Sequence, residues 1–584
     1  MPLAIVKHER VPVDALQSEC QKAFGLHGQK VAEILAQREI TALSEMENSA
    51  KFLLHYDGLT GIDAALAVLV PAVTEQKRVV IIGDFDADGA TSTALCMLAL
   101  RAMGLAHVQY LVPNRFDFGY GLSEQIVDVA QREFQAEVIV TVDNGIACHA
   151  GVAHAKALGM QVVITDHHLP GQHLPPADAI VNPNQHTCDF ASKNAAGVGV
   201  AFYVLSALRA ALAKAGWFSE SRPMPNLAEF LDIVAVGTVA DVVKLDHNNR
   251  IFVHQGLQRI RKGVARPGIL ALFEVAGKKH ANVTATDLGF VIGPRLNAAG
   301  RLDDMSLGIE CLLSDDPQRA RDIAFALDKK NVERRNIESD MREQAESTLA
   351  QITLDDSILP LGLVLYDPHF HQGVIGILAG RIKEQHYRPT IAFAQADDSE
   401  LKGSARSIPG VHIRDVLDEV NTQFPGLIIK FGGHAMAAGL SLQPTALDVF
   451  TQAFNQVLER HMQGLPQEAQ IISDGALPES CLTLEFAYLL QTLGPWGQGF
   501  TEPVFDNVMR IVQQRIVGEK HLKLVLQHGS TTIDAIAFGV DLALWPNPNV
   551  EYVHVAYSLN INEFRGQQSV QCMIKGLSAD LPRV

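Results

Sequence analysis

Residues 78–89, RVVIIGDFDADG, decide the fold. A continuous apolar run ends there in alternating acids and a glycine, which indicates a buried parallel strand that enters a turn. Residues 90–103 have the pattern of a helix. Similar runs follow as HVQYLVPNRFD at 107–117, EVIVTVDNG at 137–145, QVVITDHH at 161–168 and AIVNPN at 179–184. Helical stretches separate most of them, and this predicts a parallel sheet covered by helices on both faces, with ligands at the carboxyl ends of its strands.

The length and composition indicate an α/β protein of several domains. The chain has 584 residues, whereas a single core stops growing at roughly 250–300 residues, so we expect three or four domains. Hydrophobic residues make up 47% of the chain and charged residues 19%, which argues against long disordered tails. The net charge of −17 counts mildly against a nucleic-acid partner, although a local cleft can still be basic and bound cations offset clustered acids.

The cysteines and the N-terminus indicate where in the cell the protein is located. The seven cysteines are scattered without a CxxC pair, which is typical of reduced, mostly buried thiols. The N-terminus, MPLAIVKHERVPVDAL, has no long apolar segment, and no run approaches ~18 apolar residues. We therefore expect a cytoplasmic protein without a membrane span.

Helical patterns surround the predicted sheet. Residues 1–70 are expected to form short helices, and residues 196–216 and 227–243 two longer ones. The segment 314–352 begins with Ser and Asp beside a proline and continues with charges of both signs. This predicts a long, largely exposed helix that joins two lobes, with an ordinary surface helix as the alternative.

Two further units follow the long helix. A second α/β unit runs from about Leu361 to Ser441 and contains several glycine-rich segments, and a helix is expected near 444–463. Residues 503–577 alternate apolar and polar residues in short stretches that are separated by turns. This pattern predicts a small C-terminal β-barrel of the OB-fold type.

Three carboxylates crowd the end of the first predicted strand. Asp84, Asp86 and Asp88 alternate in GDFDADGATS, where they would repel one another in an apolar setting. On a turn their side chains can converge on a cation, and Gly89 with the following helix start can offer N–H groups to an anion. The alternative is a solvated acidic turn.

Later strand ends supply further candidates. Asp143 ends one strand, where an acid is more often a turn residue than a ligand. The triplet Asp166-His167-His168 ends another, and Asp241 lies between valines in a helical stretch, where a paired buried acid is an equal alternative. Together these groups can hold two divalent cations about 3.5–4 Å apart, which activate a bridging water for in-line attack on phosphorus. The excess of carboxylates favours Mn²⁺ or Mg²⁺ over Zn²⁺.

The ordered series DFDADG, TVDNGI, TDHH and GTVADVV resembles the DHH phosphoesterase superfamily. Four more segments narrow the likeness to a family of bacterial single-strand-specific exonucleases: NRFDFGYGLS at 114–123, GPRLNAAGRLDD at 293–304, GSARS at 403–407 and FGGHAMAAG at 431–439. This resemblance covers nearly the whole chain.

The resemblance implies a metal-ligand set and a catalytic pair. The implied ligands are Asp84, Asp86, Asp88, Asp143, His167 and Asp241. His168 would sit beside the metals and contact the scissile phosphate, with Asp166 as its catalytic partner. Many superfamily members begin the first motif with a histidine where this chain has Asp84, so the role of Asp84 stays open.

The resemblance also implies groups that bind substrate phosphates. The segment that contains Gly432, Gly433 and His434 resembles a DHHA1 domain, whose glycines let the backbone approach a phosphate, a tight turn being the alternative. Arginine matches phosphate through a bidentate fork. The full implied set is Arg115, Arg295, Asn297, Arg301, Ser404, Arg406, Gly432, Gly433 and His434.

The resulting domain boundaries are these: an N-terminal helical segment at 1–70, a DHH catalytic domain at 71–312, a connecting helix at 313–352, a DHHA1 substrate-binding domain at 353–464 and an OB-like nucleic-acid-binding domain at 465–584.

The implied activity is metal-dependent hydrolysis of single-stranded DNA from 5′ to 3′, in a cleft between the lobes, with release of 5′-mononucleotides for DNA repair and recombination. Expected partners are single-stranded DNA, single-strand-binding protein and a repair helicase, and the protein is expected to be a monomer. One rival is another DHH enzyme, such as a nanoRNase, a cyclic-dinucleotide phosphodiesterase or a pyrophosphatase. The predicted barrel and long helix argue against it. The other rival, a noncatalytic replication scaffold, is disfavoured by the retained acids and histidines.

Overall fold

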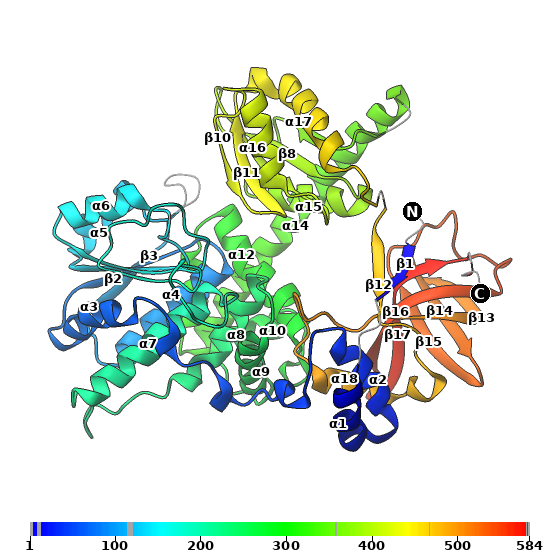
Figure 1. Cartoon of the computed structure of the whole chain (residues 1–584), viewed down its shortest axis with the longest axis horizontal. Coiled ribbons are helices and arrows are strands. Elements are labelled where there is room, and N and C mark those ends of the chain that lie inside the picture. The colour runs from blue at the N-terminus through cyan, green and yellow to red at the C-terminus, as the bar shows by residue number, and fades with distance from the viewer. Residues whose placement is uncertain are drawn as a thin grey trace. The chain divides into compact units, whose positions relative to one another are not determined.

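The computed structural model describes residues 4–8, 13–113, 121–356, 359–466, 468–579 and 581. The chain divides into two compact units (Figure 1). The larger unit contains residues 5–328 and 471–584, and the smaller contains residues 1–4 and 329–470.

The larger unit contains the predicted parallel sheet. Its strand order is β3-β2-β4-β5-β6, and every pair is parallel. From β2 the chain steps outward to β3 and then returns past β2 to β4. The switch point, where open α/β sheets bind ligands, therefore lies between β2 and β4. The strands are β2 (Val79–Gly83), β3 (Val108–Leu111), β4 (Val138–Val142), β5 (Gln161–Thr165) and β6 (Ala179–Val181).

Helices cover both faces of this sheet, as Figure 1 shows. Val80 and Ile82 pack into a core with α5 and α6, whereas Val79 and Ile81 pack into the larger core beneath α3, α4 and α7. Burial on both faces explains why the strand sequence is continuously apolar rather than alternating. The helices are α3 (Ile62–Thr74), α4 (Ala87–Ala102), α5 (Glu124–Phe134), α6 (His149–Ala157) and α7 (Gly197–Lys214).

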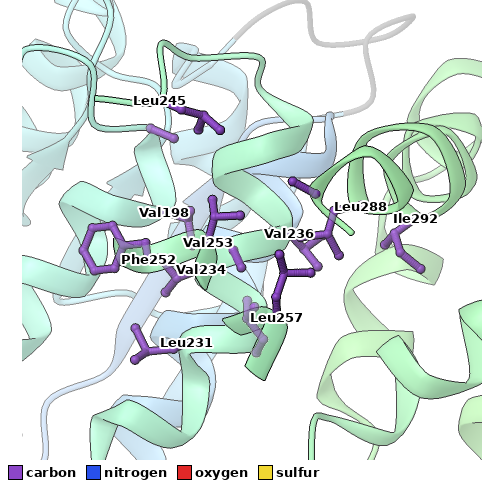
Figure 2. Close-up of a cluster of buried hydrophobic side chains, with 14 of the residues drawn as sticks. Val198, Leu231, Val234, Val236, Leu245, Phe252, Val253, Leu257, Leu288 and Ile292 are labelled. Carbon is purple, nitrogen blue, oxygen red and sulfur yellow. The ribbon is translucent and has the colours of Figure 1, made fainter. Parts of the chain in front are cut away.

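A helical layer supports the sheet on the side of α7. Figure 2 shows part of its core, in which Val198 of α7 lies in one buried cluster with Val234, Phe252 and Leu288. Leu288 belongs to a single π-turn, η7 (Leu288–Ile292), between α11 and α12. The helices of the layer are α8 (Leu231–Ala240), α9 (His247–Arg261), α10 (Pro267–Val275), α11 (Ala285–Asp287), α12 (Gly293–Leu302) and α13 (Ser306–Leu313).

The C-terminal barrel has OB-fold topology. Its closed order is β13-β14-β15-β17-β16, with β15 and β17 as the parallel pair and β13 closing against β16. Five strands in this Greek-key arrangement confirm the predicted OB-fold. The elements are α18 (Leu484–Leu493), β13 (Phe505–Val517), β14 (His521–His528), β15 (Thr531–Ala537), β16 (Tyr552–Phe564) and β17 (Gln567–Ser578).

The N-terminal segment packs against the barrel. It contains the predicted short helices α1 (Asp14–Phe24) and α2 (Gly28–Ala36), but also a strand, β1 (Ala4–Lys7), which pairs with β12 (Gln470–Ser473) and which the sequence prediction missed. A buried ion pair joins Arg38 Nη1 to Asp474 Oδ1 at 2.8 Å. The barrel and the sheet domain share one hydrophobic core within the larger unit.

The smaller unit is a mixed sheet with flanking helices. Its order is β10-β11-β9-β8-β7, in which β7 and β8 are parallel and the other pairs antiparallel. The elements are β7 (Leu363–Tyr366), α15 (Ile375–His386), β8 (Thr390–Gln395), β9 (Leu401–Arg406), α16 (Ile413–Gln423), β10 (Lys430–Gly433), β11 (Ala437–Leu442) and α17 (Leu447–His461).

The long helix between the units exists as α14 (Pro317–Asp356). It is less exposed than the sequence indicated, because Ala320, Ala324, Leu327 and Met341 are buried along one face. Charged residues occupy the remaining faces of the helix, so its narrow apolar face was not recognised in the sequence.

Within the described residues, α7 is long and apolar enough to cross a membrane, as is the bent pair of helical segments at 50–58 and 62–74. Two thirds of the apolar window of α7 is buried inside the protein, which is typical of a core helix.

Candidate metal site

Three strands of the parallel sheet end in acids at the same edge. Asp84 follows β2, Asp143 follows β4 and Asp166 follows β5. Because β2 and β4 flank the switch point, Asp84 and Asp143 lie where an α/β sheet opens to a ligand.

The acids of the first motif also begin a helix. Asp86 is the N-cap of α4, and its Oδ1 accepts hydrogen bonds from the backbone N–H of Asp88 and Gly89 at 2.9 and 3.0 Å. Helix α4 therefore starts at Ala87, three residues before the predicted start, and places Asp88 in its first turn rather than in a loop. The signal was present, since Asp is a preferred N-cap residue.

Asp88 joins two helices. Its Oδ2 accepts a hydrogen bond from Gly197 N at 2.6 Å and its Oδ1 one from Val198 N at 3.1 Å, both at the start of α7. The carboxylate thus satisfies amides that no residue inside α7 can pair, and its charge suits the positive end of that helix. Asp88 is almost fully buried, at 1% exposure.

Asp166 fixes the two histidines that follow it through hydrogen bonds. Its Oδ1 accepts hydrogen bonds from the backbone N–H of His167 and His168, at 2.7 and 3.0 Å, and lies 2.7 Å from His168 Nδ1. Its Oδ2 accepts another from Ile146 N at 2.9 Å. With these partners, Asp166 orients the triplet and belongs to none of the metal-binding groups described below.

His167 faces acids from two other elements. Its Nε2 lies 3.1 Å from Asp143 Oδ1 and 3.4 Å from Asp241 Oδ2. Asp241 is the C-cap of α8, so it ends the predicted helical stretch instead of lying within it. The backbone is strained here, because Asp143 has φ +61° and Val242, a β-branched residue, has φ +63°. Such conformations cost about 1–3 kcal/mol each and cluster at functional sites.

All of the predicted ligands and His168 come together. They form three overlapping groups in which the potential ligand atoms lie within 4.8 Å of one another: Asp84 with Asp86 and Asp143, Asp88 with His167 and Asp241, and Asp143 with His167 and His168. The geometry therefore brings five carboxylates and two imidazoles to one site.

Without a cation, the acids at this site repel one another, and the pKa values of several of them are raised. Burial, followed by the charge of Asp86, raises the pKa of Asp88 to about 7. Burial and the charge of Asp88 raise the pKa of Asp143 and of Asp241 well above the usual range. For His168, burial acts to lower the pKa, but the hydrogen bond and charge of Asp166 raise it to about 9. Divalent cations would relieve the repulsion among the acids, and this oxygen-rich donor set with imidazole fits Mn²⁺ or Mg²⁺.

Two glycines allow the elements to approach this closely. A Cβ at Gly197 would lie 2.6 Å from Asp143 Cβ, and a Cβ at Gly237 would lie 2.8 Å from Asp88 Oδ1. Neither residue was assigned to the site from the sequence, because close approach between distant segments leaves no local pattern.

Two asparagines that sequence reasoning also missed hold the histidine backbone. Asn184 Nδ2 donates to the carbonyl of His167 at 2.6 Å, and Asn182 Nδ2 donates to the carbonyl of His168 at 2.9 Å. Asn182 Oδ1 in turn accepts from Asn184 N at 2.7 Å. The NPN sequence after β6 was the available signal, since asparagines at the end of a strand next to the triplet can bind its backbone.

The predicted phosphate-binding residues of the larger unit differ in their surroundings. Arg115 lies outside the described residues. Arg295 Nη2 pairs with Asp328 at 2.8 Å, and Asn297 Oδ1 accepts from Ala87 N at 2.8 Å, next to the metal site. Arg301 lies in the last turn of α12.

In the smaller unit, Ser404 and Arg406 form one polar cluster. Arg406 Nη1 donates to Ser404 Oγ at 3.0 Å, and burial lowers the pKa of Arg406. A Cβ at Gly376, in the first turn of α15, would lie 2.8 Å from Arg406 Nη2 and 3.0 Å from Ser404 Oγ. The guanidinium therefore packs against the start of a helix, which attracts anions.

The glycine hairpin joins β10 to β11. Gly433 has φ +148°, and a Cβ there would lie 2.5 Å from Ala438 Cα, so the turn requires glycine. A Cβ at Gly432 would meet nothing within 4 Å. His434 N donates to the carbonyl of Ala437 at 2.8 Å and closes the hairpin.

Comparison with known families places this arrangement in a class. The chain matches the N-terminal domain of the DHH family at residues 78–238, the DHHA1 domain at residues 361–460 and the RecJ OB domain at residues 473–576. Fold and site thus define a DHH-type α/β protein that carries DHHA1 and OB domains, which confirms the predicted fold class and superfamily.

Individual relatives narrow the class. The single-stranded-DNA-specific exonuclease RecJ of Dickeya dadantii (strain 3937) is 54% identical over 547 residues, which cover 93% of this chain and 95% of that protein. RecJ from Thermus thermophilus in complex with Mn²⁺ has a TM-score of 0.80 at 29% identity, covering 100% of this chain and 80% of that one. The corresponding Mg²⁺ complex has a TM-score of 0.75 at 28% identity, covering 100% and 79%. The chain belongs to the RecJ family of single-stranded-DNA-specific exonucleases.

Proposed function

We propose that the protein hydrolyses phosphodiester bonds of single-stranded DNA from the 5′ end, with Mn²⁺ or Mg²⁺ in the site at the carboxyl edge of the parallel sheet. The observation that carries the proposal is the convergence of five carboxylates and two imidazoles in three overlapping groups. The family membership adds the substrate, since the relatives are named as single-stranded-DNA-specific exonucleases, and a RecJ structure of this fold holds Mn²⁺.

The proposed ligands supply two positions for cations. His167, between Asp143 and Asp241, would belong to one position, and Asp84 with Asp86 to the other, with Asp143 near both. Bound divalent cations would activate a water molecule and neutralise charge on the phosphate oxygens during in-line displacement.

His168 lies beside the proposed cations. In the absence of a cation, the hydrogen bond and charge of Asp166 raise the pKa of its imidazole to about 9, although burial acts to lower it. Asp166 Oδ1 lies 2.7 Å from His168 Nδ1, accepts a hydrogen bond from its N–H and so fixes the ring orientation. The remaining N–H is suited to a non-bridging oxygen of the scissile phosphate, and Asp166 acts by positioning this ring.

Substrate phosphates would be gripped by Arg301 in the larger unit and by the polar cluster of the smaller unit. Ser404, Arg406 and the start of α15 offer hydroxyl, guanidinium and backbone N–H donors that suit a terminal 5′-phosphate. The hairpin at Gly433 and His434 is a further proposed contact. Arg295 and Asn297, on the same helix as Arg301, are further proposed contacts, and they also bind Asp328 and the backbone N–H of Ala87.

Recognition of a 5′-phosphate would set the direction of hydrolysis and release 5′-mononucleotides. The OB-fold barrel would extend the path of the strand. A role in DNA repair and recombination, a cytoplasmic location, a monomeric state, and cooperation with single-strand-binding protein and a helicase complete the proposal.

The test uses the purified full-length protein with Mn²⁺ or Mg²⁺ and oligonucleotides labelled at either end. We expect mononucleotides to appear first from the 5′ end of a single strand, no reaction with EDTA, and little reaction on a blunt duplex. First release from the 3′ end, equal digestion of duplex, or turnover of dinucleotides alone would refute the proposal and favour another DHH activity.

A further inference from the structure

Phe290 has the highest exposure of any large apolar side chain in the described part of the chain, at 79%. It lies at the centre of η7, a single π-turn that precedes α12. Exposing most of a phenylalanine forgoes about 1.5–3 kcal/mol of burial, and π-turns occur often at functional sites. The position therefore requires a reason other than the stability of the core.

The turn directs Phe290 away from the core. Its two neighbours at spacing two, Leu288 and Ile292, are fully buried, and Figure 2 shows both in the buried cluster. A π-turn closes i to i+5, so Leu288 and Ile292 share one face and Phe290 occupies the opposite one. The aromatic ring is thus presented outward by a turn whose other face is anchored.

The same turn packs against the end of the helix that precedes the proposed ligand Asp241. A Cβ at Gly289 would lie 3.3 Å from Val239 Cγ1, and one at Gly293 would lie 3.3 Å from Ala240 Cβ. Val239 and Ala240 end α8, and the next residue is the proposed ligand Asp241. Val242, with its strained φ, is itself 62% exposed. Val242 directly follows Asp241, and Phe290 belongs to the turn that packs on α8, so both exposed apolar side chains belong to segments at this end of the helix.

Helix α12 continues from this turn to the start of α4. Asn297 Oδ1 accepts from Ala87 N, the first residue of α4. Phe290 precedes Asn297 by seven positions, which at 1.5 Å per helical residue places it about 10 Å farther along the element. That separation suits contact with a nucleotide next to the reacting one.

We propose that Phe290 is a stacking platform for a nucleobase of the single strand held at the metal site, with Val242 as a smaller apolar contact. The inference rests on the proposed function and extends it to a base-binding subsite. A single strand exposes the faces of its bases, whereas a duplex keeps them stacked. Phe290 would therefore favour single strands and tolerate any base, because every base has a π-face.

The test measures hydrolysis kinetics of the full-length protein on a 5′-phosphorylated oligothymidylate. Loss of one base–aromatic contact is worth about 1–3 kcal/mol, so Phe290→Ala should raise KM about 5- to 150-fold with a smaller effect on kcat. Phe290→Leu keeps an apolar side chain without a π-face and should also raise KM. Phe290→Trp keeps an aromatic face and should have a KM close to that of the wild type. Phe52→Ala, at a 43% exposed phenylalanine of the N-terminal segment, is the matched control.

An abasic scan locates the base. A single abasic nucleotide is moved stepwise from the 5′ end, and the wild type should show a rise in KM at one position. In Phe290→Ala the same abasic substitution should have no further effect, because the contact is already lost. An unchanged KM in Phe290→Ala, or equal abasic profiles in both proteins, would overturn the inference. Failure of the wild type to cut any single strand would instead overturn the proposed function.

Discussion

The carboxyl edge of the parallel sheet and the β10–β11 hairpin differ in how the protein holds their polar groups. At the sheet edge, Asp88 and Asp166 are buried and accept hydrogen bonds from backbone amides of several elements. At the hairpin, Gly432 and His434 are exposed, and the backbone pairing of β10 with β11 supports the turn. Function at the edge should therefore depend on individual side chains, some of which also support the fold. Function at the hairpin should depend on the conformation of one glycine.

The largest effect is expected from Asp241→Ala. Removing even an outer partner of a metal ligand typically costs 10–100-fold, so loss of a proposed direct ligand should lower hydrolysis by at least about 100-fold. Burial and the charge of Asp88 raise the pKa of Asp241, so its removal relieves repulsion. The metal-free variant should thus be no less stable than the wild type.

Initial rates on a labelled single strand and thermal unfolding with EDTA and with Mn²⁺ measure both effects. Mn²⁺ should raise the Tm of the wild type more than that of the variant, because a ligand that binds only the folded state stabilises it. Wild-type activity in Asp241→Ala would show that Asp241 is no ligand.

Comparison of Asp88→Ala with Asp241→Ala separates the proposed role of the acids in metal binding from the role of Asp88 in supporting α7. Both variants lose an acid whose pKa is raised by burial, but only Asp88→Ala leaves the amides of Gly197 and Val198 without their acceptor. A buried donor without a partner costs about 1–3 kcal/mol. In urea with EDTA, the free energy of unfolding of Asp88→Ala should be lower than that of Asp241→Ala by about 2 kcal/mol or more. Equal values would mean that Asp88 does not support α7.

The two roles of Asp88 show which features could be predicted from the sequence and which could not. The strand before it was predictable, because Ile81 and Ile82 pack into cores on opposite faces and the whole run must be apolar. The gathering of acids at one edge followed from parallel strand order. The contact between Asp88 and α7 was not predictable, because its partners, Gly197 and Val198, lie more than a hundred residues away and offer only backbone amides.

The protein partners of an arginine are harder to predict than the clustering of acids. Arg295 lies in the motif GPRLNAAGR and is predicted to bind phosphate, and in the structure it pairs with Asp328 of α14. An arginine side chain reaches several ångströms and finds carboxylates on any adjacent element, so its partner depends on tertiary packing. Acids crowded at one strand end, by contrast, must share whatever cation binds there.

Asn184→Ala should produce an intermediate effect. The variant loses the hydrogen bond to the carbonyl of His167, so the imidazole between Asp143 and Asp241 is held less firmly. Outer partners of metal ligands typically contribute 10–100-fold to metal affinity, and we expect a loss of about 10-fold. Calorimetric titration of the full-length protein with Mn²⁺ measures it, with Asn226→Ala, at the exposed N-cap of η5 (Leu227–Phe230), as the control. Unchanged Mn²⁺ affinity together with lower stability would assign Asn184 a structural role only.

The smallest effects should come from the hairpin, and there the two glycines should differ. Gly433→Ala places a Cβ against Ala438 and forces a residue with φ +148° into a conformation that side chains rarely adopt. Strain of this kind costs at least about 1 kcal/mol and would displace His434, so KM for a 5′-phosphorylated single strand should rise about 5-fold. Gly432→Ala meets open space and should change KM less than about twofold, within the usual range for surface substitutions. Equal KM values in the two variants would exclude the hairpin from the substrate grip, because only Gly433 controls the backbone that carries His434.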